Sequence, residues 1–174
     1  MQKHTLLTAT LCLGILFSSC NKDDEPKAED PATAKVTYSA WFTPATYIKD
    51  TVFGIWGFRY DKDAPDITNS VLDSSVVLTF AKLSGYNPLV WPTGQVGQMP
   101  ISLTYKQGTT QEDTWTASTT PGKLRVRFVN SVNTYSSIAN THSFRYIIIK
   151  GGIPAGRGGS MSYSDICRQY NIPE

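Results

Sequence analysis

Asp61, Asp63 and Asp66 lie close together in the sequence, and their three carboxylates could ligate a hard cation. Calcium prefers oxygen ligands of this kind, so the pattern Asp-x-Asp-x-x-Asp makes these residues candidates for a calcium site. The spacing differs from that of an EF-hand loop, and Lys62 places a positive charge between the first two acids. We therefore expect a solvated polar turn without a bound metal, with calcium binding as the alternative.

The residue types needed for acid–base or nucleophilic catalysis are sparse in this chain. His142 is the only histidine after residue 4, and no serine stands in the Gly-x-Ser-x-Gly pattern of a nucleophile elbow. Cys167 is the only cysteine after residue 20, so the His/Cys spacing of a zinc site does not occur. We expect His142 on a surface loop, Cys167 as a small core residue of a helix, and neither enzymatic activity nor a cofactor.

Residues 151–159 form a glycine-rich segment, and segments of this kind can hold a phosphate group. A phosphate-binding loop needs a helix directly after it and usually a lysine at its end. Here the helical pattern starts only near Ser162, and no Gly-Lys-Ser/Thr follows the glycines. We therefore expect a connector between two elements rather than a nucleotide site.

Aromatic residues in loops are the main candidates for a binding role. Tyr86 and Trp91 fall within residues 84–98, whose glycines, prolines and asparagine are typical of a loop. Exposed Trp and Tyr rings can stack on sugar rings or anchor a protein partner. The alternative is core packing, because tryptophan is usually mostly buried. We take Trp91 and Tyr86 as candidate ligand-binding residues and expect Trp56 to be buried.

Alternation of apolar and polar residues predicts a mostly β domain. The pattern is clearest at residues 124–128 and recurs elsewhere, at 36–42, 52–60, 76–80, 101–105, 114–116 and 144–149. Gly54 and Gly57 suggest a bulge or a close backbone approach. About seven or eight strands without alternating helices favour an all-β fold, an antiparallel β-sandwich of the immunoglobulin-like type. A closed β-barrel is the alternative, because periodicity does not separate the two.

The C-terminal residues follow a helical pattern instead. Apolar residues recur on one helix face, at Tyr163, Ile166, Cys167 and Tyr170. Ser162 and Asp165 have the spacing of a capping box at the helix start, and Pro173 follows its end. We expect a short C-terminal α-helix of about two to three turns that covers an open end or edge of the sheet.

The first twenty residues combine a basic start, an apolar stretch and a cysteine. Residues 6–17 are apolar and uncharged after a basic start, which is typical of a signal peptide and too short for a membrane span of about 20 residues. Leu-Phe-Ser-Ser-Cys at 16–20 resembles the lipobox of bacterial lipoproteins, although Phe17 holds the usual leucine position. The resemblance implies a signal peptide at 1–19 and acylation of Cys20, which would anchor the protein in the outer membrane.

The segment after the signal peptide also resembles known lipoproteins. Residues 20–34 contain the lipidated cysteine and then an acidic stretch without aromatic residues, which predicts a flexible tether. Asn-Lys-Asp-Asp-Glu at 21–25 resembles the export signal that sends Bacteroidetes lipoproteins to the outer face of the cell. Residues 76–80, 144–149 and 163–173 are similar to segments of small Bacteroidetes lipoproteins of uncharacterised function. This resemblance implies a fold and a compartment, but no activity.

Length and charge limit the function further. Residues 35–174 suffice for a single β-rich domain. Without the signal peptide, fifteen basic and fourteen acidic side chains remain, a balance that leaves no electrostatic footprint for nucleic acid. We expect a surface-exposed lipoprotein that acts as a non-catalytic binding or adhesion module for a glycan or a protein ligand. A structural subunit of an outer-membrane assembly is the alternative, and the lack of a catalytic constellation disfavours a hydrolase.

Overall fold

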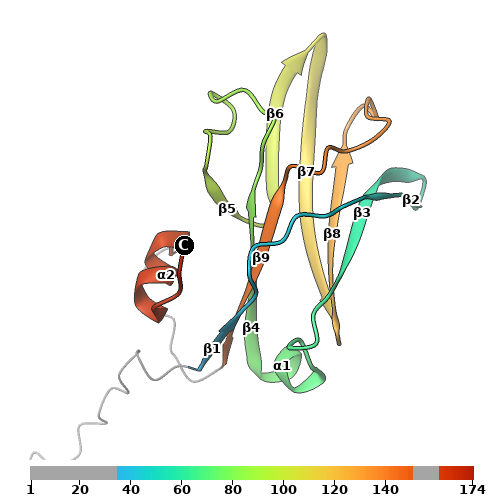
Figure 1. Ribbon diagram of the computed structural model, residues 1–174. Coiled ribbons are helices and arrows are strands. Elements are labelled where there is room, and N and C mark those ends of the chain that lie inside the picture. The colour runs from blue at the N-terminus through green and yellow to red at the C-terminus, as the bar shows by residue number, and fades with distance from the viewer. Residues whose placement is uncertain (1–34, 151–160) are drawn as a thin grey trace, which may run out of the picture.

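The strands of the protein form an antiparallel β-sandwich. The computed structural model describes residues 35–150 and 161–174, in which nine strands and two helices follow one another along the chain. The strands make a four-stranded and a five-stranded sheet that pack face to face (Figure 1). In the described part of the chain the two sheets stay separate and do not close into a barrel. The predicted β-sandwich is therefore confirmed.

The four-stranded sheet contains the two strands that run through the middle of the molecule in Figure 1. Its strand order is β1 (Val36–Tyr38), β9 (Ser143–Lys150), β4 (Ser75–Lys82) and β5 (Val96–Gln98). The central strands β9 and β4 pair along their whole length, with Val77 opposite Ile148 and Ala81 opposite Phe144. Both strands are rich in β-branched and aromatic residues, which favour a pleated, half-buried surface.

The five-stranded sheet is built from hairpins. Its strand order is β2 (Ile48–Val52), β3 (Ile55–Asp63), β8 (Lys123–Asn130), β7 (Thr109–Thr120) and β6 (Ile101–Gln107). The strand pairs β2–β3, β6–β7 and β7–β8 follow one another directly in the chain and are antiparallel. Such short connections hold consecutive strands side by side without a crossover.

The turn between β2 and β3 corrects the expectation of one bulged strand over residues 52–60. Phe53 and Gly54 connect the two strands and have φ angles of 49° and 80°. Two consecutive positive φ angles are typical of a type I′ hairpin turn, so Gly54 closes a hairpin and does not form a bulge. Gly57 fits the other expectation, because a Cβ atom there would clash with the carbonyl oxygen of Phe128 on the neighbouring strand.

The core lies between the sheets and consists of the inward-facing residues of each strand. In β8, Leu124, Val126 and Phe128 are buried, while the alternate residues Arg125 and Arg127 point to the outer face. Leu124 belongs to a second cluster. Val126 and Phe128 belong to the main cluster, together with residues of both sheets and of the segments that flank β5: Phe58, Ala81, Leu83, Trp91, Met99, Ile101, Leu103, Trp115 and Phe144. The period-two alternation in the sequence therefore decides which side chains enter the core.

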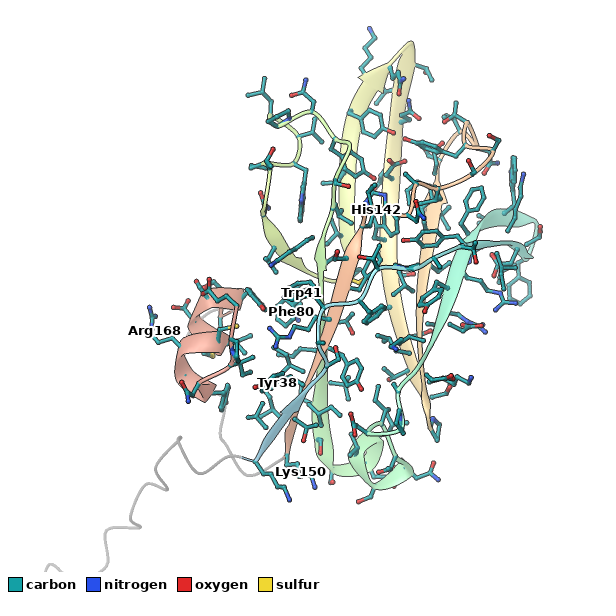
Figure 2. The ribbon with its side chains drawn as sticks, viewed as in Figure 1. Tyr38, Trp41, Phe80, His142, Lys150 and Arg168 are labelled. Atoms are coloured by element: carbon teal, nitrogen blue, oxygen red, sulfur yellow. The ribbon has the colours of Figure 1, made fainter. Side chains whose placement is uncertain are left out.

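Helix α2 (Tyr163–Tyr170) covers the outer face of the four-stranded sheet. The expectation that it covers an open end or edge of the sheet is therefore wrong. Tyr163 and Ile166 pack with Phe80 and with neighbouring apolar residues of that face. Figure 2 shows Phe80 on the side of the sheet that faces the helix, whereas Arg168 points away from the sheet. The outer face of β4 and β9 is apolar, so the helix is needed to remove it from water.

Both ends of the C-terminal segment are held by hydrogen bonds. At the helix start, the Ser162 hydroxyl accepts the N–H of Asp165, and the Asp165 carboxylate accepts the N–H of Ser162. The predicted capping box is therefore confirmed. The buried side chain of Arg145 then joins the two ends, because it donates to the hydroxyl of Tyr163 in the first turn at 2.8 Å and to the carbonyl oxygen of Pro173 after the helix.

The polar turn expected around Asp61, Asp63 and Asp66 is not one loop, because Asp61 and Asp63 belong to strand β3 and helix α1 (Asn69–Ser74) follows shortly after Asp66. The Thr68 side chain caps this helix by accepting the N–H of Val71 at 3.2 Å, and Val71 packs with Ile67 in the second core cluster. A helix of this length carries too few apolar positions to be recognised from its periodicity. In residues 35–150 and 161–174, neither helix has the length and hydrophobicity required to cross a membrane.

Candidate ligand-binding cavity

The β6–β7 hairpin and the loops before β5 and β9 lie at one end of the sandwich (Figure 1). Residues of these segments line a cavity. Its volume is about 790 Å³, within the range of roughly 300–1,000 Å³ that is common for small-molecule sites. Figure 2 shows His142, one of its wall residues, between the two sheets at the start of β9. Aromatic side chains form much of the remaining wall, namely Tyr86, Tyr105, Trp115, Phe128 and Tyr135.

The carboxylate of Asp113 lies behind this aromatic wall. Asp113 is on β7 and is 0% exposed. Its Oδ2 atom lies 2.9 Å from the Tyr86 hydroxyl and 3.0 Å from the Tyr105 hydroxyl. The Tyr135 hydroxyl is 3.3 Å from the same atom, and the Asn130 amide donates to Oδ1 at 2.6 Å. Each of these partners can donate a hydrogen bond, which suits an ionised carboxylate that only accepts.

Trp115 determines the direction of the hydrogen bond between Tyr86 and Asp113. The indole Nε1 of Trp115 lies 3.0 Å from the hydroxyl oxygen of Tyr86. Because an indole N–H can only donate, the Tyr86 oxygen accepts this bond and gives its own proton to Asp113. The Trp115 ring is 1% exposed and packed in the main core, so it holds the Tyr86 hydroxyl in one position.

Tyr105 and Tyr135 form a second pair of phenols over the same carboxylate. Their hydroxyl oxygens are 2.7 Å apart, so one hydroxyl donates to the other. The shortest contacts have Tyr135 donating to Tyr105 and Tyr105 donating to Asp113. Burial is the main cause that raises the pKa of these tyrosines and of Tyr86 above its ordinary value. The three phenols therefore remain protonated at neutral pH.

Asn130 and Gln111 support the far side of the Asp113 carboxylate. The Oδ1 atom of Asn130 accepts the backbone N–H groups of Val132 at 3.1 Å and of Thr134 at 3.3 Å. Its Nδ2 atom must therefore face the carboxylate, and it also donates to Gln111 Oε1 at 2.9 Å. A buried polar network with all its members paired is rigid and specifies one arrangement.

His142 is a buried wall residue of the cavity and not the surface residue expected. It is 6% exposed, and its ring centroid lies 4.6 Å from that of Trp115. Its Nδ1 atom accepts the backbone N–H of Ser84 at 3.2 Å, so the neutral ring carries its proton on Nε2. Burial lowers the pKa of His142 to about 4, although the charge of Asp113 acts in the opposite direction. The imidazole is therefore uncharged at neutral pH.

The two candidate aromatic residues lie in different environments. Tyr86 is half-buried and lines the cavity. Trp91 is 6% exposed and belongs to the main core, so the alternative of core packing applies to it. Trp56, which was expected to be buried, is only partly buried, with the Lys49 Nζ atom 3.3 Å from its ring centroid. Of the loop aromatics proposed from the sequence, Tyr86 is thus the one in a position to contact a ligand.

The three aspartates considered for calcium do not gather around one point. They have separate partners, which are Arg125 for Asp61, Lys123 for Asp63 and Tyr146 for Asp66. The hydrogen bond from Arg125 is the main cause that holds the pKa of Asp61 below its usual range. Within the ranges that the structure describes, no group of three or more His, Cys, Asp or Glu side chains could hold a metal ion.

Several expectations fall on residues outside the described ranges. These are the signal peptide at 1–19, the acylation of Cys20, the tether up to residue 34 and the glycine-rich connector at 151–159. They remain predictions from the sequence.

The sequence interpretation missed Asp113, Tyr105 and Tyr135 as site residues. A signal for Asp113 was present in the sequence, because Asp113 stands two residues before Trp115 and so shares its side of a strand. In the structure Gln111, Asp113 and Trp115 lie on β7 and all three are buried. A carboxylate at an inward-facing strand position is unusual and indicates a specific environment. The two tyrosines had no comparable signal, since they reach Asp113 from a different strand and from a loop.

Comparison of the chain with protein-family models, with curated proteins and with solved structures gives no match. The function of the cavity must therefore be argued from its own geometry.

Proposed function

We propose that this protein is a surface-exposed outer-membrane lipoprotein, anchored through Cys20, whose β-sandwich domain binds a glycan without catalysing a reaction. The observation that carries the proposal is the aromatic cavity with its buried hydrogen-bond network around Asp113. Small-ligand sites combine apolar and aromatic walls with a few fixed polar groups in this way.

The composition of the cavity wall suits a sugar ring. The C–H faces of a pyranose pack on aromatic surfaces, and its hydroxyl groups need hydrogen-bond partners. Tyr86 and Tyr105 provide aromatic surface, while the exposed side chains of Gln107 and Ser137 provide polar groups. Leu89 is 97% exposed and adds an apolar residue to the loop that lines the cavity.

The state of the polar groups favours binding over catalysis. Asp113 is enclosed by its donors and 0% exposed, which makes it unsuitable as a general base toward a ligand in the cavity. The Ser84 hydroxyl donates to the carbonyl oxygen of Thr141, so His142 does not activate this hydroxyl as a nucleophile. These groups can orient a bound ligand, but they do not form a catalytic pair.

The glycan-binding proposal is tested with the full chain in mild detergent. A glycan panel identifies a ligand, and titration of the intrinsic tryptophan fluorescence gives its affinity. Tyr105→Ala removes a ring from the cavity wall, and Tyr38→Ala is the matched control, because Tyr38 lies on β1 outside the cavity (Figure 2). We expect an affinity loss of about tenfold or more for Tyr105→Ala and none for Tyr38→Ala. A blank panel, or equal losses in two folded variants, would contradict the proposal.

The location is tested separately with a Cys20→Ser variant in the bacterial host. We expect the unaltered chain in the membrane fraction and the variant outside it, because the variant cannot be acylated. Protease added to intact cells should degrade the unaltered chain if the domain faces outward. A variant that stays in the membrane fraction argues against the lipid anchor, and a protected domain argues against surface exposure.

A second candidate function, that of a structural subunit of an outer-membrane assembly, is favoured by the β2–β3 hairpin. Its exposed apolar residues are Ile48, Val52, Phe53 and Ile55. Neighbouring exposed apolar residues are typical of protein contact sites. A stoichiometric partner that co-purifies with the unaltered chain and is lost with Phe53→Ser would support this function.

A further inference from the structure

The buried carboxylate of Asp113 accepts hydrogen bonds from Tyr86, Tyr105 and Asn130, as a carboxylate anion does, and no cation within the described residues pairs with it. Its partners are neutral phenols and an amide, and it takes part in none of the ion pairs found in residues 35–150 and 161–174. Charges in a low-dielectric interior act more strongly on their surroundings than charges in water. The cavity in front of Asp113 therefore has a negative potential.

Two phenol rings lie between the Asp113 carboxylate and the cavity and are polarised by it. Tyr86 and Tyr105 each hydrogen-bond to Asp113 Oδ2, and both also line the cavity. Successive hydrogen bonds polarise one another, so a phenol that donates to a carboxylate becomes more electron-rich. Aromatic faces attract cations, and the attraction is greater where water is excluded. This part of the wall is therefore suited to a positively charged group.

The other titratable and charged groups of the wall leave this potential in place. His142 is neutral because its burial lowers the pKa to about 4. Tyr135, in the loop before β9, stays protonated because burial raises its pKa. Lys106 on β6 is the charged side chain among the described lining residues, and it is exposed, so water and salt screen it.

We infer that the sugar bound in the cavity carries a protonated amine, so that the ligand class is a cationic amino sugar. The inference rests on the proposed glycan-binding function and adds the charge of the ligand to it. The amine contacts the rings and hydroxyl groups of Tyr86 and Tyr105 in front of Asp113, and the pyranose packs on the remaining aromatic wall. An N-acetylated sugar has the same ring but lacks the charge, and it gains nothing from Asp113.

Three disaccharides of the same linkage separate the effect of charge from that of shape. The probes are the β-linked dimer of glucosamine, its N-acetylated form and cellobiose, titrated calorimetrically into the full chain in mild detergent at about pH 6. We expect the glucosamine dimer to bind at least about tenfold more tightly than either neutral dimer. Equal affinities would overturn the inference and leave the proposed function intact. Failure of these sugars and of the whole glycan panel to bind would remove the proposed function itself.

The role of Asp113 is tested with Asp113→Asn, which keeps the size of the side chain and an oxygen that can accept from the tyrosines. We expect the affinity ratio between the glucosamine dimer and cellobiose to fall to about one, because the variant lacks the negative charge. An unchanged ratio in a variant with the near-ultraviolet circular dichroism of the unaltered protein would show that the preference does not come from Asp113.

The pH dependence of the unaltered protein tests the same point if Asp113→Asn does not fold. Between about pH 6 and pH 9 the amine of the glucosamine dimer loses its proton, whereas His142 is already neutral throughout this range. The affinity for the glucosamine dimer should therefore fall toward that of cellobiose, and the affinity for cellobiose should stay constant. A parallel pH response of the two sugars would contradict the inference.

Discussion

The indole of Trp91 lies directly against Gly97, where a Cβ atom would be 2.5 Å from Trp91 Cη2 and 3.1 Å from Ile101 Cδ1. Strand β5 thus presents a surface without a side chain at this position, and the indole occupies the space. By packing against the sheet, Trp91 holds the loop that begins at residue 84 in position. The first half of that loop lines the cavity. The residue therefore supports the cavity wall without reaching the ligand site.

The close contact predicts that Gly97→Ala destabilises the fold. The added methyl group overlaps the indole and the Ile101 side chain, and overpacking of this kind typically costs about 1–3 kcal/mol. Urea unfolding followed by tryptophan fluorescence measures the change. Gln98→Ala is the matched control, because Gln98 is the exposed neighbour on the same strand and should change stability by roughly 0.5 kcal/mol or less. Equal stability of the two variants would show that the core adapts to the extra volume.

The β2–β3 turn predicts a stabilising substitution at Phe53. This residue has a φ angle of 49° and is fully exposed, so its backbone is strained and its ring contributes no packing. Asparagine tolerates positive φ and is favoured before glycine in type I′ turns, so Phe53→Asn should raise the free energy of unfolding by about 1 kcal/mol. Thermal unfolding measures the effect. Phe53→Ala removes the same ring without this tolerance, and a variant no more stable than Phe53→Ala would disprove the explanation.

The network around Asp113 predicts a strong asymmetry between two deletions. Asp113→Ala leaves the Tyr86 hydroxyl and one N–H of the Asn130 amide without an acceptor, and such buried unpaired groups typically cost about 2–5 kcal/mol in total. Tyr135→Phe removes the hydroxyl that donates to Tyr105 and leaves Tyr86, Tyr105 and Asn130 to donate to the carboxylate, so it should cost about 1 kcal/mol or less. Urea unfolding compares the two variants. Similar losses would mean that the phenols find other partners when the carboxylate is absent.

Much of the fold could be predicted because its causes are local. The alternation of Leu124, Val126 and Phe128 with arginines decides which face of β8 enters the core. The spacing of Ser162 and Asp165 indicates the start of α2, and the structure has the capping box there. The place of α2 on a sheet face could not be predicted in the same way, because it depends on the apolar outer face that β4 and β9 create only when they pair.

The candidate site could be predicted only in part, because its residues converge from separate elements. Tyr86 and Trp91 gave the same signal, an aromatic residue in a glycine- and proline-rich segment, yet one lines the cavity and the other fills the core. The deciding factor is Gly97, which belongs to a strand whose pairing the sequence does not reveal. Tyr105 meets Asp113 because β6 and β7 are neighbours, and this proximity also depends on the register of the pair.

The burial of His142 predicts a specific loss of stability in mild acid. Burial lowers its pKa to about 4 in the folded protein, whereas an unfolded chain has the ordinary value of about 6.5. Above about pH 6.5 the imidazole is neutral in both states, so its effect on stability does not change with pH. Between about pH 6.5 and pH 4 the unfolded state binds a proton that the folded state does not, so the free energy of unfolding falls by about 3 kcal/mol. Below about pH 4 the folded state takes up the proton as well, and this loss stops.

The His142→Asn variant isolates this effect, because asparagine does not titrate and its side-chain oxygen can still accept the Ser84 N–H. The free energy of unfolding, measured in urea at several values between about pH 4 and pH 7, should depend much less on pH in the variant than in the unaltered protein. Asp61, Asp63 and Asp165 have pKa values lowered by hydrogen bonds, so the stability that they contribute is present at neutral pH and is lost progressively below about pH 5. The His142 effect is therefore separate from theirs between about pH 5 and pH 6.5, and at lower pH the comparison with His142→Asn removes their contribution because both proteins contain these aspartates. The same slope in both proteins would mean that His142 binds its proton equally well in the folded and unfolded states, and that the cavity does not desolvate it.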